Sequence, residues 1–225
     1  MLIFPRRSRI VFVGDSITDA DRDRSALPGG WGFGQGYVNH LHNMLTAVYP
    51  DKDLMTVNSG NSGDDIMEMA QRWEDDVLDL EPDFISVMIG VNDAWRHFDG
   101  TLRQAAVHEP DEFEEVYDGL LDLTRARLPK LQGIIVMSPF MFEANRDEAM
   151  RVKVEAFSRA SQRVAEKHHA IFVDVQAEVD HFLTRQHPCI ASADRVHPNE
   201  RGAMVVAHSW LRSVGFEWER SAFDD

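Results

Sequence analysis

Five short apolar runs, each followed directly by a glycine or a polar residue, divide this chain into alternating segments. Runs of this length that are rich in Ile and Val are typical of strands buried on both faces of a parallel sheet. They occupy residues 10–13, 54–57, 84–89, 133–137 and 170–175. Helical segments separate or follow them, at residues 37–49, 66–80, 111–128, 147–168, about 179–186 and 200–214. Strands that alternate with helices pair in parallel through right-handed crossovers. We therefore predict an α/β fold, a three-layer α/β/α sandwich with a five-stranded parallel sheet, in one domain over residues 1–225.

The charge balance indicates a small, uncharged partner. The chain has 225 residues and a formal net charge of -15, from 38 acidic and 23 basic side chains. Binding to nucleic acid requires clustered Lys and Arg, and so does binding to an anionic membrane surface. No window of the sequence is apolar over the length of a membrane span. We therefore expect neither a nucleic-acid partner nor a membrane partner, and a neutral substrate fits the composition better.

Cysteine usage and the N-terminal residues favour a cytoplasmic protein. Cys189 is the single cysteine, so no intrachain disulfide can form. Residues 1–12 contain Pro5 and three arginines among their apolar residues, whereas a secretory signal needs an uninterrupted apolar core. Cleavage there would also remove the first predicted strand. We expect the protein to act in the cytoplasm.

Ser16 lies where a parallel sheet presents reactive groups. It follows the first predicted strand after Gly14, which permits a sharp turn. Ligands of open α/β sheets bind beyond the carboxyl ends of the strands. An alternative is that Ser16 only caps the next helix, because serine is a favoured N-cap residue.

Asp194 and His197 have the spacing of an acid–base pair. A carboxylate three positions before a histidine, in a loop, can turn back and accept a hydrogen bond from imidazole Nδ1. That bond leaves Nε2 free to accept a proton and stabilises the imidazolium that forms. The chain has ten histidines, and His197 stands out among them because it has such a carboxylate in a loop and lies after the last strand.

These residues, together with Gly63 and Asn92, follow different strands but belong to the same edge of the predicted sheet. A serine nucleophile needs a base, an orienting acid and oxyanion donors. We predict that Ser16 attacks a carbonyl, His197 takes its proton and Asp194 holds His197. The backbone N–H groups of Ser16 and Gly63 and the amide of Asn92 would form the oxyanion hole. This chemistry needs no cofactor, and the absence of an H-E-x-x-H motif disfavours a metal hydrolase.

Four ordered motifs resemble those of the SGNH hydrolases, the GDSL esterase/lipase superfamily. They span most of the chain with separations similar to those of the family. In chain order they are Gly14-Asp15-Ser16, Asn58-x-Gly60-x-Ser62-Gly63, Gly90-x-Asn92-Asp93 and Asp194-x-x-His197. The resemblance implies a flavodoxin-like sandwich, and it implies the same catalytic and oxyanion-hole roles for Ser16, Gly63, Asn92, Asp194 and His197.

Further stretches are similar to intracellular acetyl-xylooligosaccharide esterases of this superfamily. They lie at residues 73–76, 88–96, 194–198 and 215–218. This narrower resemblance implies a serine acetylesterase that removes O-acetyl groups from small carbohydrates such as acetylated xylooligosaccharides. It also implies assembly into a homo-oligomer.

Carbohydrate esterases need flat aromatic surfaces for sugar rings, and four aromatic residues are placed in loops at the predicted site edge. Trp31, Trp95 and Phe140 are candidate substrate contacts, with Phe142 beside them, and ordinary packing is the alternative for each. Arg96 is a fifth candidate, which would either contact substrate or anchor a loop through ion pairs. The glycine-rich residues 29–36 would form an entrance loop, as a lid or a subunit contact, or a mobile surface loop.

Two other readings stay open. The same catalytic residues would serve a general short-chain acyl esterase, a lysophospholipase or a thioesterase. A non-catalytic flavodoxin-like module that binds a nucleotide or FMN is a more remote alternative, because the chain lacks a G-x-x-x-x-G-K-[ST] loop.

Overall fold

The computed structural model of the protein describes residues 1–27, 30–100 and 106–220. Its centre is a five-stranded sheet in which every pair of neighbouring strands is parallel. The strand order is β2-β1-β3-β4-β5, the flavodoxin-like order. The predicted three-layer sandwich with a five-stranded parallel sheet is confirmed. The strands are β1 (Arg9–Gly14), β2 (Met55–Gly60), β3 (Phe84–Met88), β4 (Gly133–Met137) and β5 (Ile171–Val173).

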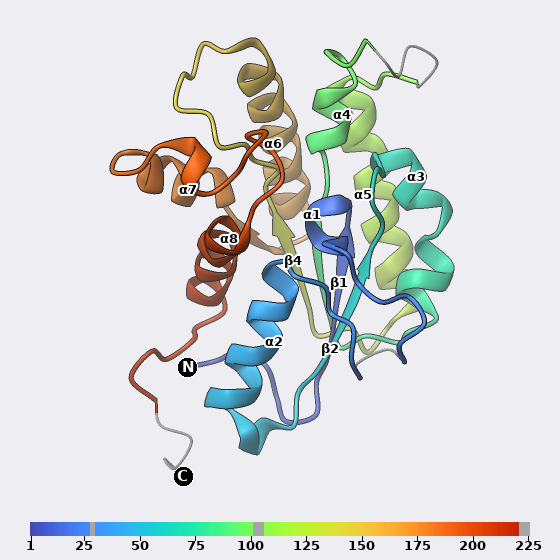
Figure 1. The fold of residues 1–225 in the computed structure, drawn as a ribbon. Helices are drawn as coiled ribbons and strands as arrows, with labels where there is room; N and C mark the ends of the chain where they lie inside the picture. The colour runs from blue at the N-terminus through green and yellow to red at the C-terminus, as the bar shows by residue number, and fades with distance from the viewer. Residues whose placement is uncertain (28–29, 101–105, 221–225) are drawn as a thin grey trace.

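Helices cover both faces of the sheet (Figure 1). One layer holds α3 (Ile66–Gln71), α5 (Pro110–Arg127) and α6 (Ala149–Lys167), which pack against each other in sequence. The other holds α2 (Tyr37–Val48), α7 (Val175–Leu183) and α8 (Glu200–Ser213), with α8 packed between the other two. Two short helices, α1 (Ser16–Asp19) and α4 (Val91–Trp95), directly follow β1 and β3.

The helices differ from the prediction in three main respects. The segment predicted as one helix at 66–80 is α3 followed by a π-helical turn, Glu74–Leu78, in which the N–H of Asp79 donates to the carbonyl of Glu74. Apolar periodicity does not separate these two helix types over so few residues. The helix predicted at 179–186 starts earlier, because Asp174 ends the strand and caps α7 by accepting from the N–H of Ala177. The helices α1 and α4 are too short to produce a periodic pattern.

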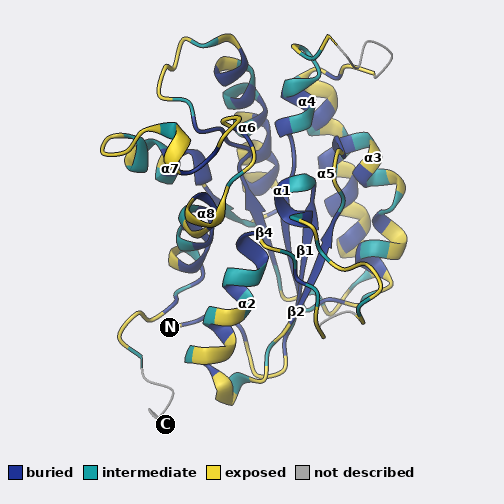
Figure 2. Ribbon diagram, viewed as in Figure 1, coloured by how far each residue is buried: buried dark blue, intermediate teal, exposed yellow. Residues whose placement is uncertain are grey.

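The sheet is buried between the helix layers, as the dark strands of Figure 2 show. On the face of α8, Phe4 stacks on Trp210 with ring centroids 5.5 Å apart, and Phe12 lies 5.3 Å from the same indole. The indole N–H of Trp210 donates to Ser86 Oγ on β3 at 3.0 Å. This packing holds β1 and β3 side by side, so the loops that leave their carboxyl ends start from a fixed edge.

Candidate active site

The turn from β1 into α1 places Ser16 at the carboxyl edge of the sheet. A Cβ on Gly14 would lie 2.2 Å from the carbonyl oxygen of Met88 on β3, so only glycine fits there. Asp15 is the N-cap of α1, since its carboxylate accepts from the N–H of Ile17 at 2.9 Å. Ser16 is therefore the first residue of the helix and not its cap. Its hydroxyl is left for other contacts.

Ser16, His197 and Asp194 form a continuous hydrogen-bonded chain. Ser16 Oγ lies 2.9 Å from His197 Nε2, and His197 Nδ1 lies 2.6 Å from Asp194 Oδ2. The other carboxylate oxygen of Asp194 accepts the N–H groups of Val196 and His197 at 2.9 and 2.8 Å. Residues 181 positions apart in sequence thus meet at one edge.

The electrostatics of Asp194 determine which nitrogen of His197 holds a proton. Partial burial would raise the pKa of Asp194, but hydrogen bonds from His197 and from the backbone outweigh it and lower the pKa to about 2. An ionised carboxylate can only accept, so Nδ1 of His197 donates to it. In the neutral imidazole Nε2 is then the acceptor for the Ser16 hydroxyl, which is the tautomer that a general base requires.

Gly63 and Asn92 lie beyond the carboxyl ends of β2 and β3, the two strands that flank β1. Gly63 follows β2 and has a φ of +93°, a left-handed conformation that glycine adopts without strain. Asn92 is in α4, which follows β3 through Gly90 at a φ of +117°. The Asn92 amide donates one N–H to the carbonyl oxygen of Asp64 at 2.8 Å. This bond links α4 to the loop that follows β2 and leaves the second amide hydrogen for another acceptor.

A cleft of about 560 Å³ opens beside Ser16 and His197. Ser62, from the loop that follows β2, lines the cleft, and so do the acidic residues Asp21 and Glu200. Its volume is in the range of small-molecule sites. The acidic lining suits an uncharged substrate better than an anionic one.

Two buried carboxyl groups underlie the site. Burial raises the pKa of Asp15 to about 7, and it does the same for Asp93. Asp93 Oδ1 accepts the N–H of Ile66, the first residue of α3, at 3.2 Å. Both carboxyls therefore hold helix N-termini next to the reactive residues, as N-terminal carboxyls commonly do.

The predicted substrate contacts lie in four different environments. The Trp95 ring lies 5.8 Å from the imidazole of His197, next to the reactive atoms. Trp31 is 88% exposed and lines a neighbouring depression that shares Asp21 and Gln35 with the cleft. Phe140 needs a correction, because it is fully buried and packs edge-on against Phe142, so a substrate cannot reach it.

Arg96 also needs a correction as a substrate contact. Its guanidinium pairs with Asp65 and with Glu68, the latter at 2.7 Å, and it donates to the carbonyl oxygen of Gly63 at 3.0 Å. The side chain is 11% exposed. Of the two roles considered for Arg96, the ion-paired loop anchor matches these contacts.

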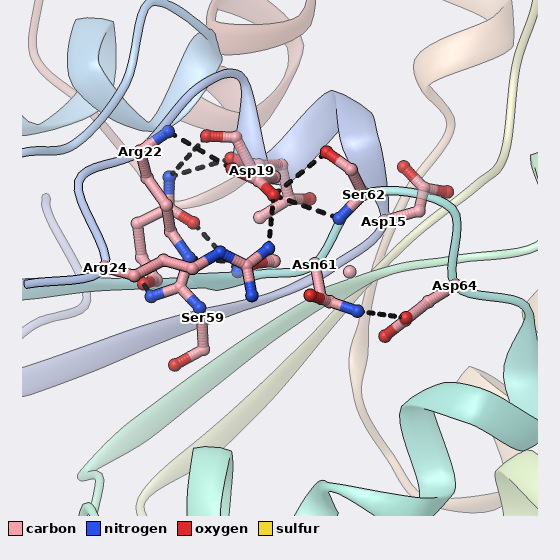
Figure 3. Close-up of polar contacts among 12 residues, drawn as sticks. Asp15, Asp19, Arg22, Arg24, Ser59, Asn61, Ser62 and Asp64 are labelled. Atoms are coloured by element: carbon pink, nitrogen blue, oxygen red, sulfur yellow. Dashed lines mark hydrogen bonds and ion pairs between the residues drawn. The ribbon is translucent and has the colours of Figure 1, made fainter.

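Sequence reasoning missed two charged residues that organise this edge. Arg72 donates to the carbonyl oxygens of Gly14 and Ser59, at the ends of β1 and β2, and pairs with Asp64. A single arginine in a stretch of acidic residues was the only signal for it. Asp19 accepts from the N–H and the hydroxyl of Ser62 (Figure 3), and nothing in the sequence pattern indicated this contact.

Among the described residues, no group of three or more His, Cys, Asp or Glu side chains is arranged to hold a metal ion. Within the same residues, no helix combines the length and the apolar character needed to cross a membrane.

Comparisons with known proteins agree with the geometry. Residues 12–205 match the model of the GDSL-like lipase/acylhydrolase family. An acetylxylan esterase from Geobacillus stearothermophilus is 39% identical over 214 residues, which cover 95% of this chain and 96% of that protein.

Solved structures are similar over nearly the whole chain. The α/β hydrolase LAE5, from the metagenome of Lake Arreo, is 39% identical with a TM-score of 0.91, covering 96% of this chain and 99% of that one. The acetylxylan esterase Axe2 from Geobacillus stearothermophilus is 38% identical with a TM-score of 0.91, covering 98% and 100%. The family match spans far more than half of the sequence, and the chain belongs to the GDSL-like lipase/acylhydrolase family.

Proposed function

We propose that the protein is a serine esterase that removes O-acetyl groups from small carbohydrates, with acetylated xylooligosaccharides as the substrate class. The observation that carries the proposal is the chain from Ser16 Oγ through His197 to Asp194, with links of 2.9 and 2.6 Å, at the edge of a cleft. The acetylxylan esterases to which the chain is similar support the acetyl group and the sugar.

Acylation follows from the positions of these groups. Ser16 Oγ attacks the ester carbonyl carbon while His197 Nε2 takes the hydroxyl proton, and Asp194 stabilises the imidazolium. The carbonyl oxygen becomes an oxyanion, which accepts from the N–H groups of Ser16 and Gly63 and from the amide of Asn92. When the intermediate collapses, His197 gives its proton to the departing sugar oxygen, and an acetyl ester remains on Ser16.

In deacylation, a water molecule takes the place of Ser16 as the nucleophile. His197 Nε2 takes a proton from a water molecule, whose oxygen attacks the acetyl carbon. The same three donors hold the second oxyanion, and its collapse returns the proton to Ser16 Oγ and releases acetate. Crystal structures of Axe2 catalytic mutants with a serine, a histidine or an aspartate changed to alanine support this set of residue types.

Sugar contacts are proposed for two tryptophans of this edge, the partly buried Trp95 and the exposed Trp31. Trp95 lies close enough to His197 to contact the sugar ring that carries the acetyl group. Trp31, in the adjoining depression, would contact a more distant ring of an oligosaccharide. Asp21 and Glu200 in the cleft would hydrogen-bond sugar hydroxyls and disfavour anionic substrates.

The test is a substrate panel run on the wild type and on Ser16→Ala. It contains acetylated xylooligosaccharides, 4-nitrophenyl esters from acetate to decanoate, an acetyl thioester and a lysophospholipid. We expect the highest kcat/KM for acetyl esters and release of acetate from the xylooligosaccharides, both abolished in Ser16→Ala. A preference for acyl chains longer than hexanoyl, or for the thioester or the lysophospholipid, would replace the acetylesterase with one of the alternative activities.

We also propose a cytoplasmic location, assembly into a homo-oligomer and a single domain. The exposed, unpaired thiol of Cys189 is compatible with the reducing cytoplasm. Trp218, which is 49% exposed, offers apolar surface that a second copy of the chain would cover in a homo-oligomer. Light scattering coupled to gel filtration measures the assembly, and a single cooperative unfolding transition would support one domain over residues 1–225.

A further inference from the structure

The Cα of Gly63 faces open space on the side where a side chain would lie. A Cβ built on Gly63 would meet no atom within 4 Å, and both Ser62 and Gly63 are exposed. Glycine at a positive φ also lets the neighbouring peptide units rotate at little cost. An oxyanion donor has to be fixed before the charge develops. If Gly63 donates, hydrogen bonds to the groups on either side of its N–H are the contacts that can fix the direction of that N–H.

On one side of this peptide, Asp19 holds Ser62. Its Oδ2 accepts the backbone N–H of Ser62 at 3.0 Å and the hydroxyl of Ser62 at 2.9 Å. In Figure 3, Ser62 directs both groups toward Asp19. Asp19 is itself fixed, because it is 5% exposed, pairs with Arg24 at 2.8 Å and accepts the N–H of Arg22. Burial opposes ionisation of Asp19, but the hydrogen bonds from Ser62 and Arg24 outweigh it and lower the pKa of Asp19.

On the other side, Arg96 holds the carbonyl oxygen of Gly63. Its Nη2 donates to that oxygen at 3.0 Å, while Asp65 and Glu68 neutralise and orient the guanidinium. Arg96 is the C-cap residue of α4, the helix that carries Asn92. The contact therefore fixes Gly63 relative to the second predicted oxyanion donor.

The contacts made by Asp19 and Arg96 lie on either side of one peptide group that can rotate. The peptide that contains the Gly63 N–H turns about ψ of Ser62 and φ of Gly63. Asp19 fixes the atoms before these bonds, and Arg96 fixes the atoms after them. We propose that Asp19 and Arg96 are positioning residues that together aim the Gly63 N–H at the developing oxyanion. The proposal rests on the proposed esterase function and assigns to both residues a role in rate that is separate from substrate binding.

Charged hydrogen bonds on both sides of an exposed peptide predict a specific kinetic signature. Without either contact, the Gly63 N–H samples other orientations, so the transition state loses stabilisation that the bound substrate does not use. We expect a fall of ~10- to 100-fold in kcat, below the ~10²–10³-fold cost of removing an oxyanion donor outright. KM for a small ester should stay unchanged.

The experiment compares Asp19→Asn and Arg96→Gln with matched controls on α5 and α6. Asp118→Asn and Arg163→Gln remove the same chemical groups from the α5–α6 ion pairs, where Asp118 contacts Lys167 and Arg163 contacts Glu114. Each protein is assayed with 4-nitrophenyl acetate for kcat and KM. Inhibition by phenylboronic acid is also measured, because boron accepts Ser16 Oγ and forms a tetrahedral anion that resembles the intermediate.

The expected result is a lower kcat and a raised inhibition constant for the boronic acid, by similar factors, in both site variants and in neither control. Arg96→Lys, which retains one cationic donor, should recover part of the lost kcat. Unchanged kcat and unchanged boronic acid inhibition in the folded variants would overturn the proposal. So would a rise in KM alone, or loss of the folded state in both Asp19→Asn and Arg96→Gln by circular dichroism.

Assays of the wild type and of Ser16→Ala distinguish a failure of the positioning proposal from a failure of the proposed esterase function. If the wild type hydrolyses 4-nitrophenyl acetate and Ser16→Ala does not, the esterase stands, and the site variants test the positioning alone. If Ser16→Ala keeps full activity, the esterase proposal itself fails, and the positioning proposal fails with it.

Discussion

The carboxyl edge of the sheet and the apolar layer beneath α8 are stabilised in opposite ways. At the edge, charged side chains hold the strand ends and the segments that follow them, as when Arg72 donates to the carbonyl oxygens of Gly14 and Ser59. In the apolar layer, Phe4 and Phe12 pack against Trp210, with one hydrogen bond to Ser86. Directional bonds fix orientation, whereas burial of apolar area supplies most of the free energy of folding. Substitutions in the two regions should therefore affect different measurements.

The largest expected effect is a loss of kcat, without a loss of stability, caused by a substitution at the carboxyl edge of the sheet. Ser16→Ala should lower kcat by ~10³-fold or more, since loss of a nucleophile in comparable triads has at least this cost. The melting temperature should stay close to that of the wild type, because the hydroxyl is not part of the packing. Steady-state kinetics and a thermal melt check both parts, with Ser158→Ala on α6 as the control. Near-wild-type kcat would remove Ser16 from the mechanism.

The next largest effect is a loss of stability, without a comparable loss of kcat, caused by a substitution in the apolar layer beneath α8. Trp210→Ala should lower the free energy of unfolding by about 3–5 kcal/mol, the usual cost of emptying the site of a large buried aromatic ring. Urea denaturation measures it, with the 88% exposed Trp31→Ala as a control that should change stability by less than ~0.5 kcal/mol. If folded Trp210→Ala loses kcat as strongly as Ser16→Ala, the separation between the two regions does not hold.

A smaller rate effect is expected for the amide donor. Asn92→Ala should lower kcat by ~10²–10³-fold, the effect of removing one oxyanion donor, with little change in KM. The boronic acid assay supplies an independent measurement, since affinity for the tetrahedral adduct should fall in parallel. A change confined to KM would assign Asn92 to substrate binding.

The smallest expected effect is a change in the pH dependence of stability. Burial, with Asp15 and Glu68 nearby, raises the folded-state pKa of Asp93 to about 7 from an ordinary value of 3.8. Because the pKa of Asp93 is higher in the folded state than in the unfolded state, Asp93 stabilises the folded protein fully only at pH values below the unfolded-state pKa. This contribution to the free energy of unfolding is lost as pH rises from about 4 through about 7. Asp93→Asn should therefore lose less stability than the wild type between pH 5 and pH 8. Parallel urea curves at both pH values for both proteins would contradict this expectation.

The sheet was predictable because its signal is local. Each strand is a run of apolar residues buried on both faces, and the glycine or polar residue after it marks the carboxyl edge. Ser16, His197 and Asp194 were predicted to share one edge because parallel strands present their following loops together. The roles of these residues in catalysis remain predictions until the variants are measured.

Other features depend on tertiary contacts that leave no local pattern. Phe140 follows a strand like the predicted site residues do, but its ring turns into the core against Phe142. Arg96 comes three residues after the end of the third motif, and only the folded chain brings the Gly63 carbonyl and Asp65 within its reach. Asp19 reaches Ser62 across 43 positions of sequence. Composition and periodicity contain no information about such pairs.

Trapping of the covalent intermediate tests the central claim most directly. The wild type is mixed with 4-nitrophenyl acetate for less than one turnover and quenched in acid, and its peptides are examined by mass spectrometry. We expect one acetyl group on the peptide that contains Ser16, with none on that peptide in Ser16→Ala. Steady hydrolysis with no acetyl group on Ser16, or with the acetyl group on another residue, would contradict the account.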